Sequence, residues 1–297
     1  AIIFVSYLRC ISMEKGKTIT FAAGIVTFNP DLQRLKENIE SLVKNELLGK
    51  IFIVDNASEN INELKELLNT FPTVTLIGNG QNYGIAYALN VICQQAQQSG
   101  FDWVMTLDQD SVLQPNILQE YAKHTADVGV GIICPRIEDR NMGRQYATTD
   151  HGWEKIDQCI TSGNLVNLTA WKEIGGFDEK LFIDGVDFDF CIRMRKAGYG
   201  ILRSNNVYLL QEVGKGRSKS LFGKTFSIMN HGGKRLYYII RNYLYLGKKH
   251  HQRLHWTTEV GKRVFIVMTY EHHRLQKLGY MLRGLVDFVR GKMGKLE

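Results

Sequence analysis

Two aspartates stand two positions apart in the segment TLDQDS at residues 106–111, directly after an apolar run. On extended backbone Asp108 and Asp110 point to the same side, because side chains alternate along a strand. Paired carboxylates of this kind suit Mg²⁺ or Mn²⁺, which take few protein oxygens and complete their coordination with phosphate oxygens. A solvated turn before a helix has the same composition, so the pair by itself leaves both interpretations open.

A second group of carboxylates lies downstream in the segment LFIDGVDFDF. Its members are Asp184, Asp187 and Asp189, set among apolar side chains. Burial raises the pKa of a carboxyl group and makes it a candidate general base. The alternative is an acidic first helical turn in which Arg193 pairs with Asp189 at the i+4 spacing. That alternative explains Asp189 better than it explains Asp187.

The elements that must position these residues alternate between short β-branched runs and longer helical stretches. We expect strands at 18–28, 51–55, 73–78, 103–108 and 130–134, and helices at 31–45, 62–69, 84–98 and 115–124. This alternation is typical of βαβ units around a mainly parallel sheet with helices on both faces. Ligands of such α/β sheets bind beyond the carboxyl ends of the strands, where this chain places Asn29, Asp55, residues 79–84 and residues 108–111.

Several other kinds of site are excluded. The segment GNGQNYG at 78–84 has the wrong glycine spacing for a dinucleotide fingerprint and follows the third expected strand, not the first. No P-loop sequence is present. The five cysteines contain no CxxC pair, which argues against zinc or thioredoxin chemistry and favours a reducing, cytosolic environment. No apolar run reaches the ~18 residues of a conventional membrane-spanning helix.

The net charge of +7 hides a division of the chain. Residues 1–212 hold 19 Lys and Arg against 26 Asp and Glu, whereas residues 213–297 hold 18 against 4. Apolar residues at helical spacing between Val260 and Val289 stand among these basic residues. Such helices either lie in an anionic membrane interface or pack on protein, and the sequence leaves both open. No nucleic-acid recognition motif accompanies the charge, so we expect no nucleic-acid partner.

We therefore expect three parts: an N-terminal extension at 1–17, a catalytic domain at 18–222 and a basic, amphipathic helical region at 223–297. Seven segments, in order, resemble glycosyltransferase family 2: IVTFNP, IVDNAS, NYGIAYALN, TLDQDS, SGNL, IGGFDEKLFIDGVDFDFCIR and AGYG. TLDQDS, LFIDGVD and the later YYIIRN are similar to the bacterial rhamnosyltransferase-like group that builds cell-surface polysaccharides. The resemblance covers about residues 20–245. It implies the GT-A nucleotide-diphospho-sugar transferase fold, Rossmann-like, with a C-terminal helical extension.

The resemblance also implies roles for individual residues. It assigns the nucleotide-sugar donor to Thr27, Asn29, Asp55, Asn82, Gly84 and Asp108, with Asp55 accepting from the pyrimidine N–H. It assigns the metal to Asp110 with Asp108, the catalytic base to Asp187, and the vicinity of the transferred sugar or acceptor to Gly163, Asn164 and Asp184. Two positions depart from the family pattern. Val186 replaces the Glu of its Glu-Asp pair, and Gln211 stands where a metal-binding His is frequent.

The function implied by the resemblance is that of an inverting glycosyltransferase with Mg²⁺ or Mn²⁺ as cofactor. It would move rhamnose from dTDP-rhamnose, or another sugar from a UDP-sugar, to a lipid-linked saccharide. We expect a cytoplasmic enzyme, peripheral at the inner face of the cell membrane, and leave a homo-oligomer open. The departures at Val186 and Gln211 keep an alternative in view, a non-catalytic relative that binds a nucleotide sugar or scaffolds an assembly.

Overall fold

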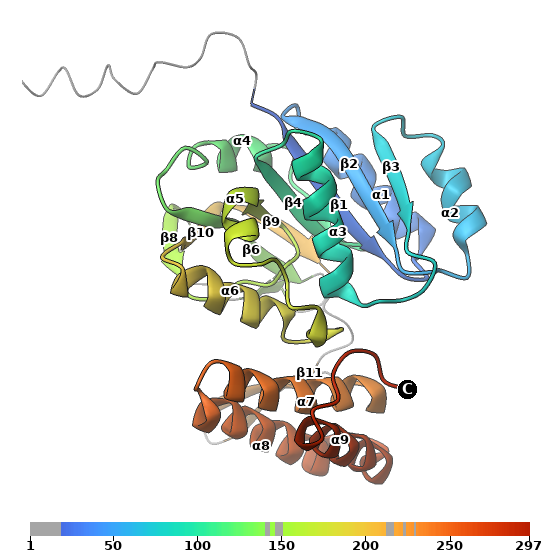
Figure 1. Cartoon of the computed structure of the whole chain (residues 1–297), viewed down its shortest axis with the longest axis vertical. Coiled ribbons are helices and arrows are strands. Elements are labelled where there is room, and N and C mark those ends of the chain that lie inside the picture. Colours follow the sequence, from blue (N-terminus) through green and yellow to red (C-terminus); the bar gives the residue numbers. More distant parts are fainter. Residues whose placement is uncertain (1–18, 140–142, 146–150, 212–216, 222–223, 229) are drawn as a thin grey trace, which may run out of the picture.

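The computed structural model describes residues 19–139, 143–145, 151–211, 217–221, 224–228 and 230–297. The expected N-terminal extension at 1–17 and the expected boundary at 222–223 lie outside these residues. Figure 1 shows an α/β layer built on a central sheet, with a layer of three C-terminal helices beside it.

The central sheet is mixed and mainly parallel. Its order is β3 (Val74–Gly78), β2 (Leu48–Asp55), β1 (Phe21–Thr27), β4 (Trp103–Asp108), β9 (Asn164–Asn167), β6 (Val130–Asp139), β10 (Gly200–Gln211) and β5 (Val112–Leu113). Strands β3, β2, β1, β4, β6 and β10 run in one direction, and β9 runs against them between β4 and β6. Strands β7 (Gly143–Gln145) and β8 (Trp153–Ile156) pair antiparallel with β6 and β10. The predicted mainly parallel sheet is confirmed. The strands β5, β7, β8, β9 and β10 were not predicted; all but β10 have at most four residues, which are too few for a periodic pattern.

The apolar run of β2 explains why helices cover both faces of the sheet. Phe52 and Val54 face the cluster formed with α3 (Ile85–Gln98) and α6 (Val186–Lys196). Ile51 and Ile53 face the opposite cluster, with α1 (Leu32–Val43), α2 (Ile61–Leu68) and α4 (Ile117–Ala122). A strand that is covered on both faces needs apolar residues at consecutive positions. The short helices α5 (Leu168–Glu173) and η1 (Glu179–Leu181) precede α6.

The strand register brings the carboxyl ends of the parallel strands to one edge. Thr27 pairs with Asp55, Asp55 pairs with Gly78, and Val26 pairs with Asp108. The polar residues that follow these strands therefore gather at this edge, as expected for a ligand site.

The C-terminal region forms three helices, α7 (Gly233–Lys249), α8 (Arg253–Tyr270) and α9 (Arg274–Val289). Their shared core contains Leu236, Ile240, Val267 and Met281. A β-carbon on Gly284 would come within 2.5 Å of the Tyr237 carbonyl oxygen, so glycine allows α9 to approach α7 closely. Before these helices, β11 (Arg217–Leu221) and β12 (Lys224–Ile228) form an antiparallel ribbon. Within the part of the chain that the structure covers, no helix combines the length and apolarity needed to cross a membrane.

Helix α7 is attached to the α/β layer next to the start of α6. The Asn242 side-chain amide donates to the carbonyl oxygens of Ile183 and Asp184, at 2.7 and 2.8 Å. Asp189, which is fully buried on α6, accepts from Lys249 at 2.7 Å and lies 2.9 Å from His250 Nε2. Buried charges must be paired. These contacts hold the acidic loop of 184–187 against the C-terminal helices.

Candidate active site

A cavity of about 690 Å³ lies at the carboxyl edge of the sheet. Its walls come from segments far apart in the sequence: the end of β4, the start of α3, the loop and first turn of α6, and the C-terminal region. Of the predicted site residues it gathers Asn82, Gly84, Asp108, Asp110, Asp184 and Asp187, and it adds Gln211, His231, Arg235 and Tyr243.

Asp108 is fixed at the end of β4 by its backbone. Its N–H donates to Ser162 Oγ at 3.0 Å, and its carbonyl oxygen accepts from Asn38 at 2.7 Å. Its Oδ2 accepts from Gln211 Nε2 at 2.9 Å. Burial, followed by the negative charges of Asp110 and Asp187, raises the pKa of Asp108 to about 6. Asp110 and Asp187 therefore lie close enough for their negative charges to oppose ionisation of Asp108.

Asp187 lies in the first turn of α6 and faces the cavity. The two residues before the helix, Asp184 and Gly185, have φ of 62° and 86°, and this sharp turn brings the helix start to the cavity wall. Asp187 Oδ1 accepts from the Phe188 N–H at 2.9 Å. Burial, with the neighbouring Asp184 adding to it, raises the pKa of Asp187 to about 6. A carboxyl with this pKa and this position can serve as a general base near neutral pH.

Asp189 behaves as the sequence alternative expected. Its Oδ2 accepts from Arg193 Nε at 2.7 Å across one helical turn, and its side chain is fully buried away from the cavity. The two aspartates therefore separate by helical geometry, Asp187 toward the cavity and Asp189 into the ion-paired interior.

The residues at the cavity offer oxygen ligands to a divalent cation. Gln211 lines the cavity with Asp108 and Asp110, and its buried Oε1 has no hydrogen-bond partner. A bound cation would relieve the repulsion that raises the pKa of Asp108. Among the described residues, no group of three or more His, Cys, Asp and Glu is arranged to hold a metal. Asp108, Asp110 and Gln211 nevertheless supply oxygen donors of the kind that Mg²⁺ and Mn²⁺ take when phosphate oxygens complete the coordination, and a metal at this site remains a prediction.

Thr27 and Asp55 are buried, each next in sequence to a residue that lines the cavity. Thr27 Oγ1 donates to Asp55 Oδ1 at 2.9 Å, and the Ser58 N–H donates to Asp55 Oδ2 at 2.9 Å. Both side chains are at most 1% exposed, and neither is among the cavity-lining residues. Asn29 also lies off the wall, with its Oδ1 accepting from the Glu59 N–H at 2.7 Å. The nucleotide contacts expected of these three residues remain predictions.

Asn82 and Gly84 lie on the wall formed by the start of α3. The Gly84 N–H donates to Asn82 Oδ1 at 2.9 Å. Gly84 has φ of 92°, and a β-carbon there would come within 2.3 Å of the Phe182 carbonyl oxygen. Glycine is therefore required here by close packing against the loop before α6.

Of the two remaining predicted residues, Gly163 ends the turn before β9 and Asn164 begins β9. Gly163 has φ of 82°, and its carbonyl oxygen accepts from the Tyr121 hydroxyl at 3.0 Å. Asn164 lines a second, smaller cavity of about 150 Å³. This second cavity shares Asp187 with the large one.

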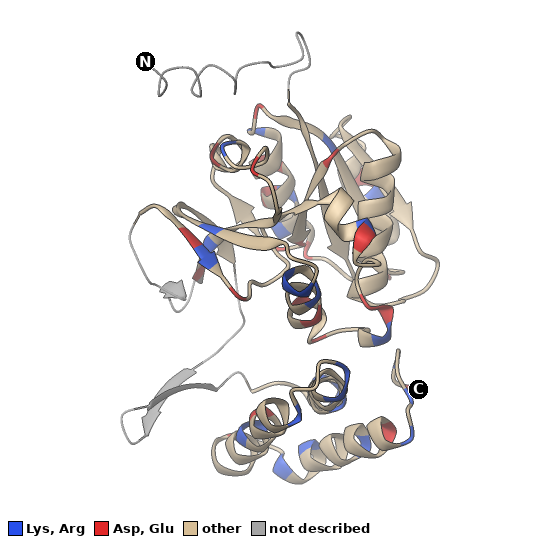
Figure 2. Ribbon diagram, turned by 60° about the vertical axis from the view of Figure 1, so that its left-hand side comes forward, with Lys and Arg blue, Asp and Glu red and all other residues tan. Residues whose placement is uncertain are grey.

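Sequence reasoning missed the contribution of the C-terminal region to the large cavity. Arg235 pairs with Asp184 at 3.0 Å, and His231 and Tyr243 line the same wall. Burial and the charges of Arg235, Arg263 and Lys277 lower the pKa of His231 to about 3. Figure 2 shows how Lys and Arg recur along these helices. The signal in the sequence is HGGKR at 231–235, one residue before the YYIIRN segment, but by composition it is indistinguishable from the rest of the basic region.

Comparison with known proteins identifies the family of the chain. Residues 23–195 match the family described as glycosyl transferase family 2. The chain is 26% identical over 293 residues to the dTDP-rhamnosyl transferase RfbF of Shigella flexneri, covering 92% of this chain and 96% of that protein. It is 28% identical over 174 residues to a hyaluronan synthase of Streptococcus pyogenes, covering 51% of this chain and 40% of the synthase.

Solved structures share the fold at low identity. The crystal structure of residues 1–349 of S. aureus TarS superposes with a TM-score of 0.59 at 13% identity, covering 91% of this chain and 81% of TarS. The mannosyltransferase PcManGT of Pyrobaculum calidifontis, in complex with GDP-Man and Mn²⁺, superposes with a TM-score of 0.57 at 14% identity, covering 99% and 84%. These likenesses bear on the fold alone.

Proposed function

The chain belongs to glycosyltransferase family 2 and has the GT-A fold, and from that premise we propose that it transfers rhamnose from dTDP-rhamnose to a saccharide acceptor with inversion at the anomeric carbon. The similarity of this chain to the dTDP-rhamnosyl transferase over nearly its whole length supports dTDP-rhamnose as the donor. The observation that carries the chemistry is the meeting of Asp108, Asp110, Asp187 and Arg235 at one cavity.

In the proposed reaction, Asp187 removes the proton from an acceptor hydroxyl. The freed oxygen attacks the anomeric carbon as the bond to the diphosphate breaks, and the diphosphate carries away the negative charge. Arg235, which lines the same cavity, stabilises this charge as it develops. Asp108 and Asp110 would hold a divalent cation, which neutralises diphosphate charge when bound. Val186 stands where the family pattern has the Glu of its Glu-Asp pair, so that carboxylate is missing here. Asp184 lies near enough to contribute to the raised pKa of Asp187.

The first test is calorimetry with dTDP, UDP and GDP, each with and without Mn²⁺. We expect dTDP to bind most tightly, and Mn²⁺ to increase its affinity, because Asp108 and Asp110 would hold a cation that neutralises phosphate charge. The Asp110→Ala variant should lose the increase caused by Mn²⁺ and keep the binding of the base. If UDP bound most tightly, the proposed donor would be a UDP-sugar instead of dTDP-rhamnose. Binding of dTDP-rhamnose without transfer to any saccharide would favour the non-catalytic alternative.

We further propose that the C-terminal helices contact anionic lipid beside a lipid-linked acceptor at the cytoplasmic membrane face. The apolar residues at helical spacing between Val260 and Val289 form a buried group and an exposed group in the structure. Val260, Val264 and Leu278 pack against the core of the three helices. The exposed remainder includes Leu275 at 88%, Leu282 at 61% and Val289 at 76%. Apolar side chains next to basic ones are the composition of helices that bind membrane interfaces.

Sedimentation with anionic vesicles tests the membrane proposal. The protein should bind at low salt and dissociate as salt rises, because screening acts beyond a Debye length of about 8 Å at physiological salt. Leu275→Asn with Leu282→Asn should weaken binding, since exposed apolar area is lost. Val128→Asn is the matched control, because Val128 is also exposed but lies in the α/β layer. The proposal would be contradicted if the double variant bound vesicles as well as the Val128→Asn control, or if the wild type did not bind at low salt.

A further inference from the structure

Arg235 faces two anions in the proposed reaction, Asp184 and the diphosphate. It donates from Nε and Nη2 to the Asp184 carboxylate at 3.0 to 3.3 Å, and the described residues give that carboxylate no other ion-pair partner. The Asp184 side chain is 13% exposed, whereas that of Arg235 is 51% exposed and lines the large cavity. A diphosphate that engages Arg235 therefore competes with a mostly buried carboxylate for one positive charge.

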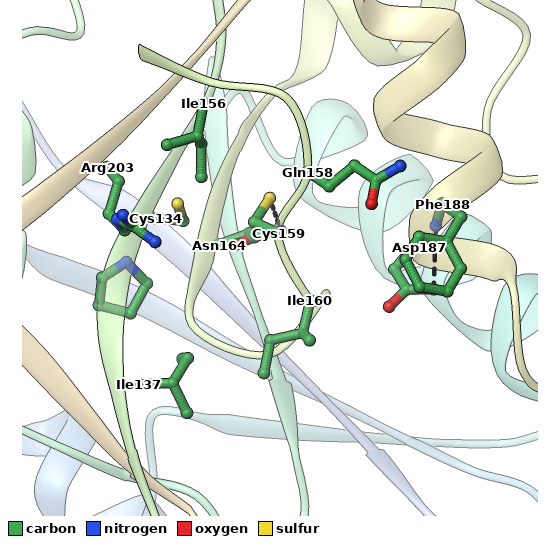
Figure 3. A pocket seen from close by; sticks show the side chains of 11 residues that line it. Cys134, Ile137, Ile156, Gln158, Cys159, Ile160, Asn164, Asp187, Phe188 and Arg203 are labelled. Atoms are coloured by element: carbon green, nitrogen blue, oxygen red, sulfur yellow. Dashed lines mark hydrogen bonds between the residues drawn. The ribbon is translucent and has the colours of Figure 1, made fainter. Parts of the chain in front are cut away.

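Helix α8 carries a second cation, Arg263, on the side that packs toward the acidic loop. Val264, the next residue, belongs to the same helical core as Tyr243 of α7. Phe188, at the start of α6 (Figure 3), contacts the rings of Tyr243 and Trp256, with centroid distances of 6.1 and 5.3 Å. Helices α7 and α8 therefore pack together against the start of α6, where the acidic loop ends.

Among the described residues, Arg263 offers a buried nitrogen without a partner. Its Nη1 is buried and makes no hydrogen bond with any of them. Burial raises the pKa of Asp184 above its usual range, and the positive charges of Arg235 and, less strongly, Arg263 oppose this rise. Arg263 is therefore near enough to act on Asp184, although no ion pair joins the two in this state. Buried donors are almost always satisfied, so a donor left unpaired here indicates an acceptor that reaches it in another state of the protein.

We propose that Arg263 is a positioning residue that pairs with Asp184 when the diphosphate of a bound nucleotide draws Arg235 into the large cavity. The exchange of one arginine for the other keeps the Asp184 carboxylate paired, which matters because an unpaired buried charge is costly. It also leaves Arg235 free to serve the diphosphate with its whole charge. This inference rests on the proposed function, because it needs a nucleotide diphosphate at Arg235.

Calorimetry with dTDP and Mn²⁺ on the whole chain tests the exchange. Arg263→Gln should weaken dTDP binding about tenfold or more, because Asp184 has no second charged partner and holds Arg235 back. Arg263→Lys should recover most of the affinity, since it restores the charge. Lys262→Gln is the matched control and should bind dTDP like the wild type, because it removes an exposed positive charge one residue away. Unchanged dTDP affinity in Arg263→Gln would overturn the proposal.

A double variant separates positioning from direct contact with the nucleotide. When Asp184→Asn is combined with Arg263→Gln, no carboxylate competes for Arg235, so the dTDP affinity should return to about that of the wild type. If the double variant bound dTDP as weakly as Arg263→Gln alone, Arg263 would contact the nucleotide itself, and the exchange would be wrong.

Melting temperatures with and without dTDP separate positioning from a general structural role. Without nucleotide, Arg263→Gln should melt close to the wild type, because Arg263 is unpaired in that state. With saturating dTDP and Mn²⁺ the variant should gain less than the wild type, since bound ligand stabilises in proportion to its affinity. An Arg263→Gln protein that is already unfolded or strongly destabilised without nucleotide would make Arg263 a structural residue and overturn the exchange.

The wild type distinguishes failure of this inference from failure of the proposed function. If the wild type binds dTDP but Arg263→Gln binds it equally well, the exchange fails and the proposed function stands. If the wild type binds no nucleotide, the proposed function is rejected, and this inference with it.

Discussion

Replacing Asp187 with Asn should lower kcat for sugar transfer by about 10²- to 10⁴-fold, the usual contribution of a general base. The amide has the shape of the carboxylate but cannot accept the proton of the acceptor hydroxyl. The affinity for dTDP should change little, because the proposed role of Asp187 is contact with the acceptor hydroxyl and not with the nucleotide. Steady-state kinetics and calorimetry on the same preparation separate the two effects. Turnover like that of the wild type would exclude Asp187 as the base.

The pH profile sharpens this prediction. Activity of the wild type should fall as pH decreases through about 6, because Asp187 and Asp108 both have pKa values raised to about 6 and must be ionised. The two groups interact, so the apparent values belong to the pair. In Asp187→Asn the residual activity should depend less steeply on pH over this range. If the pH profile of Asp187→Asn matched that of the wild type, the loss of activity at low pH would belong to another group.

The melting temperature of Asp187→Asn shows whether the variant is correctly folded. A carboxyl whose pKa is raised on folding binds its proton more tightly in the folded state. Its ionisation therefore costs stability as pH rises from about 4 to about 6, and the cost is complete above that range. Asp187→Asn removes the cost, so its melting temperature at pH 8 should equal or exceed that of the wild type. A lower melting temperature would indicate structural damage instead.

Replacing Arg235 with Ala should lower kcat/KM by about 10²-fold or more, the size of the loss when one preorganised charge-stabilising group is removed. Arg235 comes from α7 and lies on the same cavity as the carboxylates. Its charge opposes that of the leaving diphosphate. Arg235→Lys should restore part of the activity because it restores the charge. Lys234→Ala is the matched control, since it removes an exposed positive charge one residue away.

The ion pair with Asp184 offers a second explanation that the same experiment separates. Arg235 donates from two nitrogens to Asp184, at 3.0 to 3.3 Å, and could act only by holding that loop. In that case Asp184→Asn should reproduce the loss of activity, and Arg235→Ala should leave dTDP affinity unchanged. A direct role predicts weaker dTDP binding in Arg235→Ala alone. The split between binding and turnover therefore decides the role.

The sequence by itself determined the parts of the protein that depend on local pattern. The consecutive apolar residues of IFIV indicated a strand covered on both faces, and the structure places alternate residues of β2 in two separate clusters. The i and i+2 spacing of Asp108 and Asp110 predicted that both would face the ligand edge, and both line the large cavity. The suspected pairing of Asp189 with Arg193 is also a local, helical relation. In each case the periodicity of one element fixes which way its side chains point.

Tertiary structure alone decided which distant elements complete the site. Arg235 reaches the cavity because Asn242, some 60 residues beyond the acidic loop, binds the backbone of Ile183 and Asp184. The small cavity exists because β6, β8 and α6 converge with the loop that carries Cys159 and Ile160. These contacts depend on how the surfaces of different helices and strands pack together, and the sequence pattern of one element does not encode that packing. The physical reason is that periodicity records the orientation of a side chain within its own element, whereas a site is formed by packing between elements.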